Sequence, residues 1–92
     1  MRLFTTAIAP LILMATSAFG AFTIDETHEA AKAATTSFKD KHADHVQHYT
    51  GYKVWKSGDD AKVKIYVNHD GMNMEYNYTC HKHDTGIECH EQ

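Results

Sequence analysis

Proline is almost absent from this 92-residue chain, whose one proline, Pro10, lies close to the N-terminus. No glycine or proline occurs from Ala21 to Thr50. Because these two residues most often interrupt helices, their absence favours one continuous helix there. An excess of positive charge is also missing, since the formal net charge is −3. The chain therefore has no electrostatic reason to bind nucleic acid or an anionic membrane.

Cysteine is equally scarce, with only Cys80 and Cys89. They do not form a Cys-x-x-Cys motif, so the sequence gives no support to a thioredoxin-like or zinc-ribbon site. In an exported protein two cysteines most simply form one disulfide, and the alternative is two free thiols acting as metal ligands. A Gly-rich phosphate loop, a nucleophile elbow and a His-Glu-x-x-His motif are all missing. We therefore predict a protein that is not an enzyme and has no organic cofactor.

The chain has one apolar run, over residues 3–15, and it is short for a membrane-spanning helix, which needs about 20 apolar residues. Arg2 precedes this run and small residues follow it, an order typical of a secretory signal peptide cleaved after Ala18 or Gly20. An uncleaved N-terminal anchor is the alternative. We predict that residues 1–20 are the cleaved signal, and that the protein is exported, either periplasmic or extracellular, with no membrane contact after cleavage. Residues 21–92 then form a single small α+β domain with one disulfide.

Residues 24–47 carry the pattern of an amphipathic helix. Thr23 and Glu26 have the spacing of a capping box, in which each side chain hydrogen-bonds the other residue's backbone N–H. On a 3.6-residue period one face of the helix is mostly apolar. This face consists of Ile24, Thr27, Ala31, Ala34, Phe38, His42, His45 and Tyr49.

After Gly51 the sequence changes to alternating strand patterns. The first strand is predicted over residues 52–56, followed by a four-residue loop, Ser57 to Asp60. The dipeptide Asp70-Gly71 favours a two-residue hairpin turn, which pairs Val67 with Met74 and continues to Ala61 with Cys80. A slip by one residue would place lysines opposite tyrosines and methionines, so this register is strongly specified. The predicted fold class is α+β, with one N-terminal amphipathic helix packed on a four-stranded antiparallel meander sheet.

Histidine is abundant, with eight residues, and three of them lie beside the cysteines. Residues 84–86, Asp-Thr-Gly, predict a tight turn, with either a two-residue loop that places Cys80 and Cys89 directly opposite or a three-residue loop that offsets them. With the cysteines toward the core, alternation places the neighbouring polar side chains on the other face. Three imidazoles and a carboxylate suit Zn²⁺, Cu²⁺ or Ni²⁺. The predicted metal ligands are His81, His83, His90 and Glu88, and the alternative is that they are ordinary exposed polar residues.

A second set of histidines forms another candidate metal cluster, in which His42 and His45 lie three residues apart on one helix face. Its members are His42, His45, His48 and His69. The alternative is that these histidines cover the rim of the core. Met72 and Met74 near His69 resemble a thioether-rich pattern that favours Cu⁺, although their alternation with tyrosines also fits core packing.

Metal binding is the predicted function, and a non-enzymatic interaction module without metal, such as an inhibitor or an assembly subunit, is the alternative. A pH-responsive interface is a further hypothesis, because free histidine titrates near pH 6.5. A helix on an antiparallel meander is similar in architecture to cystatin-like inhibitors. Residues 47–51, Gln-His-Tyr-Thr-Gly, are similar to their Gln-x-Val-x-Gly loop, with Tyr49 in place of valine and a location at the helix exit. The protein partner stays open at this point.

Overall fold

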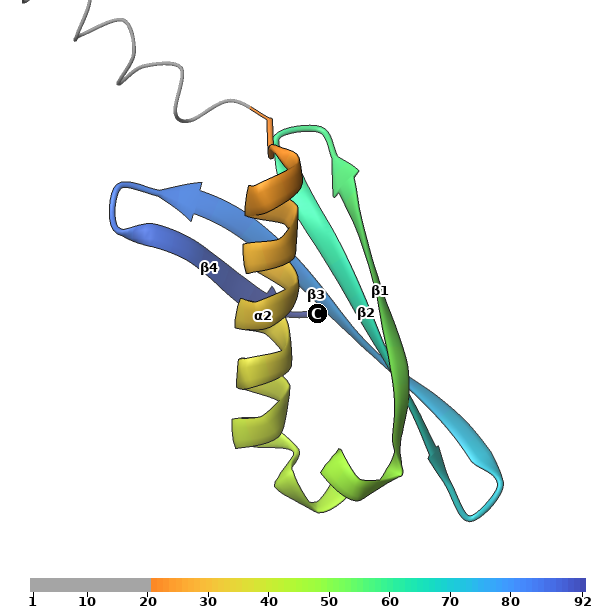
Figure 1. Cartoon of the computed structure of the whole chain (residues 1–92). Helices are drawn as coiled ribbons and strands as arrows, with labels where there is room; N and C mark the ends of the chain where they lie inside the picture. The colour runs from red at the N-terminus through yellow and green to blue at the C-terminus, as the bar shows by residue number, and fades with distance from the viewer. Residues whose placement is uncertain (1–20) are drawn as a thin grey trace, which may run out of the picture.

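A computed structural model describes residues 21–92, which form one helix, one 3₁₀ helix and a four-stranded antiparallel sheet (Figure 1). The predicted signal peptide, residues 1–20, lies outside the described residues. The strands follow one another in the order β1-β2-β3-β4, which is a meander. The elements are α2 (Ile24–Lys41), η1 (Ala43–His48), β1 (Tyr49–Ser57), β2 (Asp60–His69), β3 (Met72–His83) and β4 (Gly86–Glu91).

Helix α2 begins with the predicted capping box. The Thr23 hydroxyl accepts from the Glu26 backbone N–H at 3.1 Å, and the Glu26 carboxylate accepts from the Thr23 N–H at 2.9 Å. One expectation about the apolar face is wrong, because Ile24 is 79% exposed, whereas Phe22, just before the cap, is 2% exposed and belongs to the core. Phe22 lies outside the helix, so a helical period could not identify it.

The predicted extension of the helix to Gln47 is also wrong. Helix α2 lies within the chain, from Ile24, rather than at its N-terminus, and it ends at Lys41. His42 has φ −126° and ψ 49°, which is not helical, and residues 43–48 continue as the 3₁₀ helix η1. The cause is tertiary, because the His42 ring packs 4.4 Å from the Tyr76 ring and its Nε2 lies 2.9 Å from Glu91 Oε1. Such contacts override helix propensity.

The register of the β2–β3 hairpin is the predicted one, from His69 opposite Met72 to Ala61 opposite Cys80. The turn at Asp70-Gly71 has φ values of 56° and 78°, and the glycine adopts its positive φ without steric cost. Strand β1 begins at Tyr49, earlier than expected, and a bulge lies between Tyr49 and Gly51. Ser57 pairs with Asp60, so the predicted four-residue loop is a two-residue turn.

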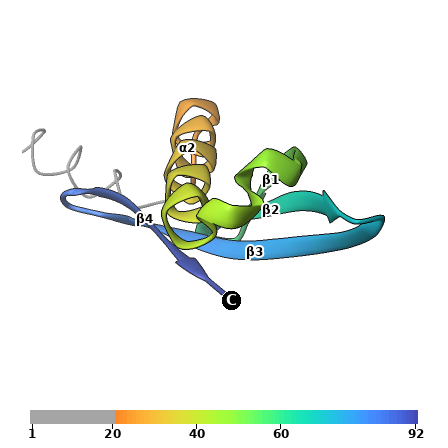
Figure 2. The same ribbon diagram turned by 90° about the horizontal axis from the view of Figure 1, so that it is seen from below.

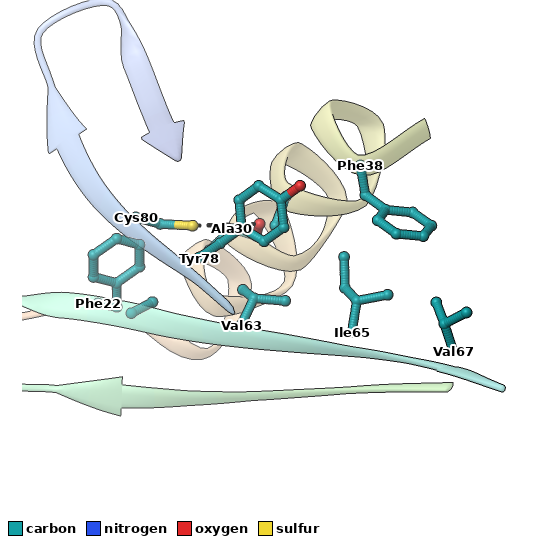
Figure 3. Packing of buried hydrophobic residues seen from close by; sticks show 10 residues of the cluster. Phe22, Ala30, Phe38, Val63, Ile65, Val67, Tyr78 and Cys80 are labelled. Carbon is teal, nitrogen blue, oxygen red and sulfur yellow. Dashed lines mark hydrogen bonds between the residues drawn. The ribbon is translucent and has the colours of Figure 1, made fainter. Parts of the chain in front are cut away.

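The core lies between α2 and one face of the sheet (Figure 3). Figure 2 shows α2 and η1 on the same side of the sheet, so the opposite face has no helical cover among residues 21–92. Alternation along β2 and β3 therefore sends every second side chain to the uncovered face. The buried residues of the core cluster are Phe22, Ala30, Ala34, Phe38, Ala61, Val63, Ile65, Val67, Tyr78 and Cys80.

Candidate functional site

The disulfide divides the β3–β4 hairpin into two layers. Cys80 and Cys89 are directly opposite, with Cα atoms 4.0 Å apart, and they form the predicted disulfide, so the alternative of two free thiols is wrong. Their sulfur atoms lie 3.7 and 3.5 Å from the Ala30 carbonyl oxygen of α2. A disulfide sulfur has no hydrogen to donate, so this is a packing contact. The cysteines therefore face the helix, and their neighbours in sequence face the other way.

Those neighbours come together on the uncovered face as the hairpin cluster, defined as His81, His83, Glu88 and His90. Strand pairing places His81 opposite Glu88. The Glu88 carboxylate is the centre of the cluster, because its Oε1 lies 3.0 Å from His83 Nε2 and 3.7 Å from His90 Nε2. The His81 ring lies 5.7 Å from the His90 ring and 6.5 Å from the His83 ring, between centroids.

Asp60 is a fifth member of this surface that the sequence reasoning missed. Its Oδ1 lies 2.9 Å from His81 Nδ1, within hydrogen-bonding distance. The predicted strand register could have identified Asp60. Because Ala61 pairs with Cys80, the next position along the two strands places Asp60 opposite His81. Asp60 fixes the orientation of the His81 ring and leaves Nε2 as the nitrogen available to a ligand.

The hairpin cluster is open to solvent, with side-chain exposures of 40% for His81, 50% for His83 and 58% for both Glu88 and His90. Within residues 21–92 no three or more His, Cys, Asp or Glu side chains stand in a geometry that could hold a metal ion. The predicted ligands are therefore neighbours that already have polar partners: His83 and His90 contact Glu88, and His81 contacts Asp60. A metal ion would have to replace the Glu88 contacts and change side-chain rotamers.

The second set of predicted ligands separates into two parts. His45, His48 and His69, here called the turn cluster, come together where η1 meets the end of β2. The His48 and His69 rings stack with centroids 4.0 Å apart, and the His45 ring lies 5.7 Å from the His69 ring. His42 contacts Glu91 instead, so the structure does not bring it into this cluster.

His42, Glu91 and Tyr78 connect the end of α2 to the last strand. Glu91 Oε1 accepts from the Tyr78 hydroxyl at 3.4 Å as well as contacting His42 Nε2 at 2.9 Å. Burial raises the pKa of Tyr78 to about 12, and the nearby Glu91 charge adds to the shift. Both effects disfavour the phenolate. This contact explains why the final strand lies against the helix end.

Lys82 holds the other end of the hairpin against the start of α2. Its side chain is 8% exposed, and Nζ donates to Glu26 Oε1 at 3.0 Å and to the Ala21 carbonyl at 3.1 Å. It also lies 5.5 Å from the centre of the Phe22 ring. Hydrogen bonding from the Thr23 backbone, and then from Lys82, lowers the pKa of Glu26. Lys82 thus attaches the helix-facing side of the β3–β4 hairpin to the start of α2, whereas the histidines lie on the opposite face.

No helix within residues 21–92 has the length and apolarity needed to cross a membrane. We compared the chain with protein-family models, with curated proteins and with solved structures, and none of the three comparisons found a match.

Proposed function

We propose that this protein is a small, exported, non-enzymatic protein that binds a late-transition metal ion, Cu, Zn or Ni, at the hairpin cluster. The observation that carries the proposal is the position of Glu88, whose carboxylate contacts both His83 and His90. His81 stands directly across the strand pair from it. Three imidazoles and one carboxylate are the ligand types that these ions take in proteins.

The contacts that now occupy the cluster are weak enough for a metal ion to replace. Glu88, His83 and His90 are all at least half exposed, and contacts at such exposed positions contribute about 0–1 kcal/mol even between two charged groups. Reorganisation would involve side chains alone, since the strand pairing already fixes the backbone. His81 needs the least change, because Asp60 holds its Nδ1 and a carboxylate–histidine pair of this kind orients metal ligands.

Export to the periplasm or the extracellular space is part of the proposal. Its support is the disulfide between Cys80 and Cys89, because disulfides persist mainly in oxidising compartments. In such a compartment a surface metal site would act as a buffer, chaperone or sensor for the ion.

The test is a Zn²⁺ titration of the purified protein, followed through the histidine ring signals by NMR. We expect the signals of His81, His83 and His90 to shift together at micromolar Zn²⁺. Glu88→Gln keeps the shape of the side chain and should weaken binding at least tenfold, because it removes the charged ligand. The matched control is His28→Ala, since His28 is exposed on α2 and belongs to neither cluster. Ring signals that do not move at millimolar Zn²⁺ would refute the proposal.

A specific observation also favours the alternative function, a protein-interaction module. Strand β1 is an edge of the sheet and pairs only with β2 among the described strands. Two aromatic side chains on it are strongly exposed, Tyr49 at 44% and Tyr52 at 48%. They line an apolar cavity of about 270 Å³ together with Phe38 and Val46. An unpaired edge strand with exposed aromatics is a common binding surface for an extended segment of a partner.

This alternative predicts a partner that copurifies at a fixed stoichiometry whether or not a chelator is present. Substitution of Tyr49 and Tyr52 by serine should abolish the association, whereas Glu88→Gln should leave it unchanged. Loss of the partner on chelation would instead favour the metal proposal.

A further inference from the structure

We propose that the turn cluster is a second and separate metal site, selective for a copper ion, in which Met72 joins His45, His48 and His69. This proposal does not depend on the hairpin cluster, because the two sets share no residue. It rests on how the end of the β2–β3 hairpin meets η1.

The three rings come from two elements that are distant in sequence. His45 and His48 lie on the 3₁₀ helix η1, and His69 is the last residue of β2. The stacked pair, His48 and His69, has ring centroids 4.0 Å apart with an interplanar angle of 25°. His45 meets His69 edge-on, with centroids 5.7 Å apart and an interplanar angle of 78°. Within residues 21–92 no such group stands in a metal-binding geometry, so an ion here would require the rings to rotate away from their present contacts.

Met72 supplies the donor that distinguishes copper from other metals. It pairs directly with His69 across the hairpin, so the two side chains share one face of the sheet. Most apolar residues on this face are in the core, but Met72 is 66% exposed. Its sulfur is therefore accessible. Thioethers are soft ligands that favour Cu⁺, and imidazole binds copper in either oxidation state.

The surroundings of the turn cluster also favour a cation. Asp44 Oδ2 lies 3.6 Å from His45 Nε2, and Asp70 Oδ2 lies 3.6 Å from His69 Nε2. Two carboxylates thus lie beside the rings and attract positive charge. His45 Nδ1 is buried and has no hydrogen-bond partner among the described residues. Buried polar atoms are almost always paired, so this unpaired imidazole nitrogen is a candidate ligand atom.

The two proposed sites lie at opposite ends of β3, as Figure 1 shows from the positions of the hairpin turns. Strand β3 runs from Met72 to His83. At a rise of about 3.3 Å per residue, Met72 and His81 are about 30 Å apart. One ion cannot bridge this distance, so each cluster would bind its own metal and can be tested by its own ring signals.

The test is an anaerobic Cu⁺ titration with ascorbate as the reductant, since Cu⁺ is diamagnetic and allows NMR of the ring and methyl signals. We expect His45, His48, His69 and the Met72 methyl group to shift together, reaching saturation at one equivalent for this site. Met72→Leu, an exposed and nearly isosteric change, should weaken Cu⁺ binding there at least tenfold while changing Zn²⁺ binding less than twofold. His48→Ala should abolish the shifts of His45 and His69.

The control is again His28→Ala, which should leave all of these shifts unchanged. If Cu⁺ moves the turn-cluster rings no more than it moves His28, the copper site does not exist. If the rings shift but Met72→Leu binds Cu⁺ as tightly as the original chain, the assignment of the thioether and of copper selectivity is wrong. Failure of the hairpin cluster is recognised separately, because it concerns only the signals of His81, His83 and His90.

Discussion

Reduction of the disulfide should destabilise this domain severely. Cys80 is fully buried, and the bridge joins β3 to β4 while its sulfurs pack on Ala30 of α2. It also closes the short hairpin that carries the hairpin cluster, with a sequence separation of 9. The main effect of breaking it is on the unfolded chain, which gains the conformations that the crosslink excludes.

The size of the effect follows from the length of the closed loop. For about ten residues the chain-entropy model gives about 2.7 kcal/mol. A domain of this length typically has about 4–11 kcal/mol of total stability, at about 0.05–0.15 kcal/mol per residue. In so small a domain each kcal/mol changes the melting temperature by about 4–8 °C. Reduction should therefore lower the Tm by about 11–22 °C.

The assay is thermal denaturation followed by far-UV circular dichroism, with and without a phosphine reductant. Reduced thiols fill nearly the same volume as the disulfide, so the comparison isolates the crosslink. The matched control is the double variant Cys80→Ala/Cys89→Ala, whose Tm should not respond to the reductant. A difference of less than 3 °C between oxidised and reduced protein would refute the reasoning, because it would mean that packing alone holds β4 in place.

Two further predictions concern groups whose pKa values are shifted. The pKa of Glu26 is lowered, so its contribution to stability is present above its ordinary value of 4.5 and is lost as the pH falls. Glu26→Gln should therefore lower the Tm at pH 7 and make little difference at pH 3, and an equal loss at both pH values would contradict this. The pKa of Tyr78 is raised to about 12, so its stabilising effect is complete below pH 10 and is lost as the pH rises toward 12. Absorbance titration at 295 nm should show one tyrosine that ionises at higher pH than the others, and this step should be missing in Tyr78→Phe. If all five tyrosines ionise together, the raised pKa of Tyr78 is wrong.

The sheet could be predicted closely because its determinants are local. Alternation along β2 and β3 and the Asp70-Gly71 turn specify one register, and the structure has that register. For the turn between β3 and β4, the sequence is compatible with either of two loop lengths. Pairing of His83 with Gly86 gives the two-residue form, which places the cysteines directly opposite each other. Either loop length is compatible with the turn residues, so only the pairing of the whole hairpin decides between them.

The end of the helix could not be predicted, because its cause lies 49 residues away. The Glu91 carboxylate contacts the His42 ring, and no local pattern marks that contact. The predicted grouping of His42 with His45 requires the same α-helix to continue through both residues, but α2 ends at Lys41. The 3₁₀ helix η1 brings His45 and His48 to the His69 ring, whereas His42 contacts Glu91 and the Tyr76 ring.

The hairpin cluster and the turn cluster differ in the structural elements that position their histidines. This difference determines how much a bound metal ion would stabilise the fold at each cluster. The hairpin cluster is positioned by strand pairing alone, on a face without helical cover, so its side chains can reorganise without disturbing the core. The turn cluster depends on the contact between η1 and the β2–β3 hairpin, where the His45 ring also packs 6.0 Å from Tyr76. A metal ion there would connect two elements and should stabilise the fold, because it binds the native state alone. At the hairpin the disulfide keeps the histidines close together even in the unfolded chain, so the ion can bind that state as well. Binding there should therefore raise the Tm less at the same affinity for the folded protein.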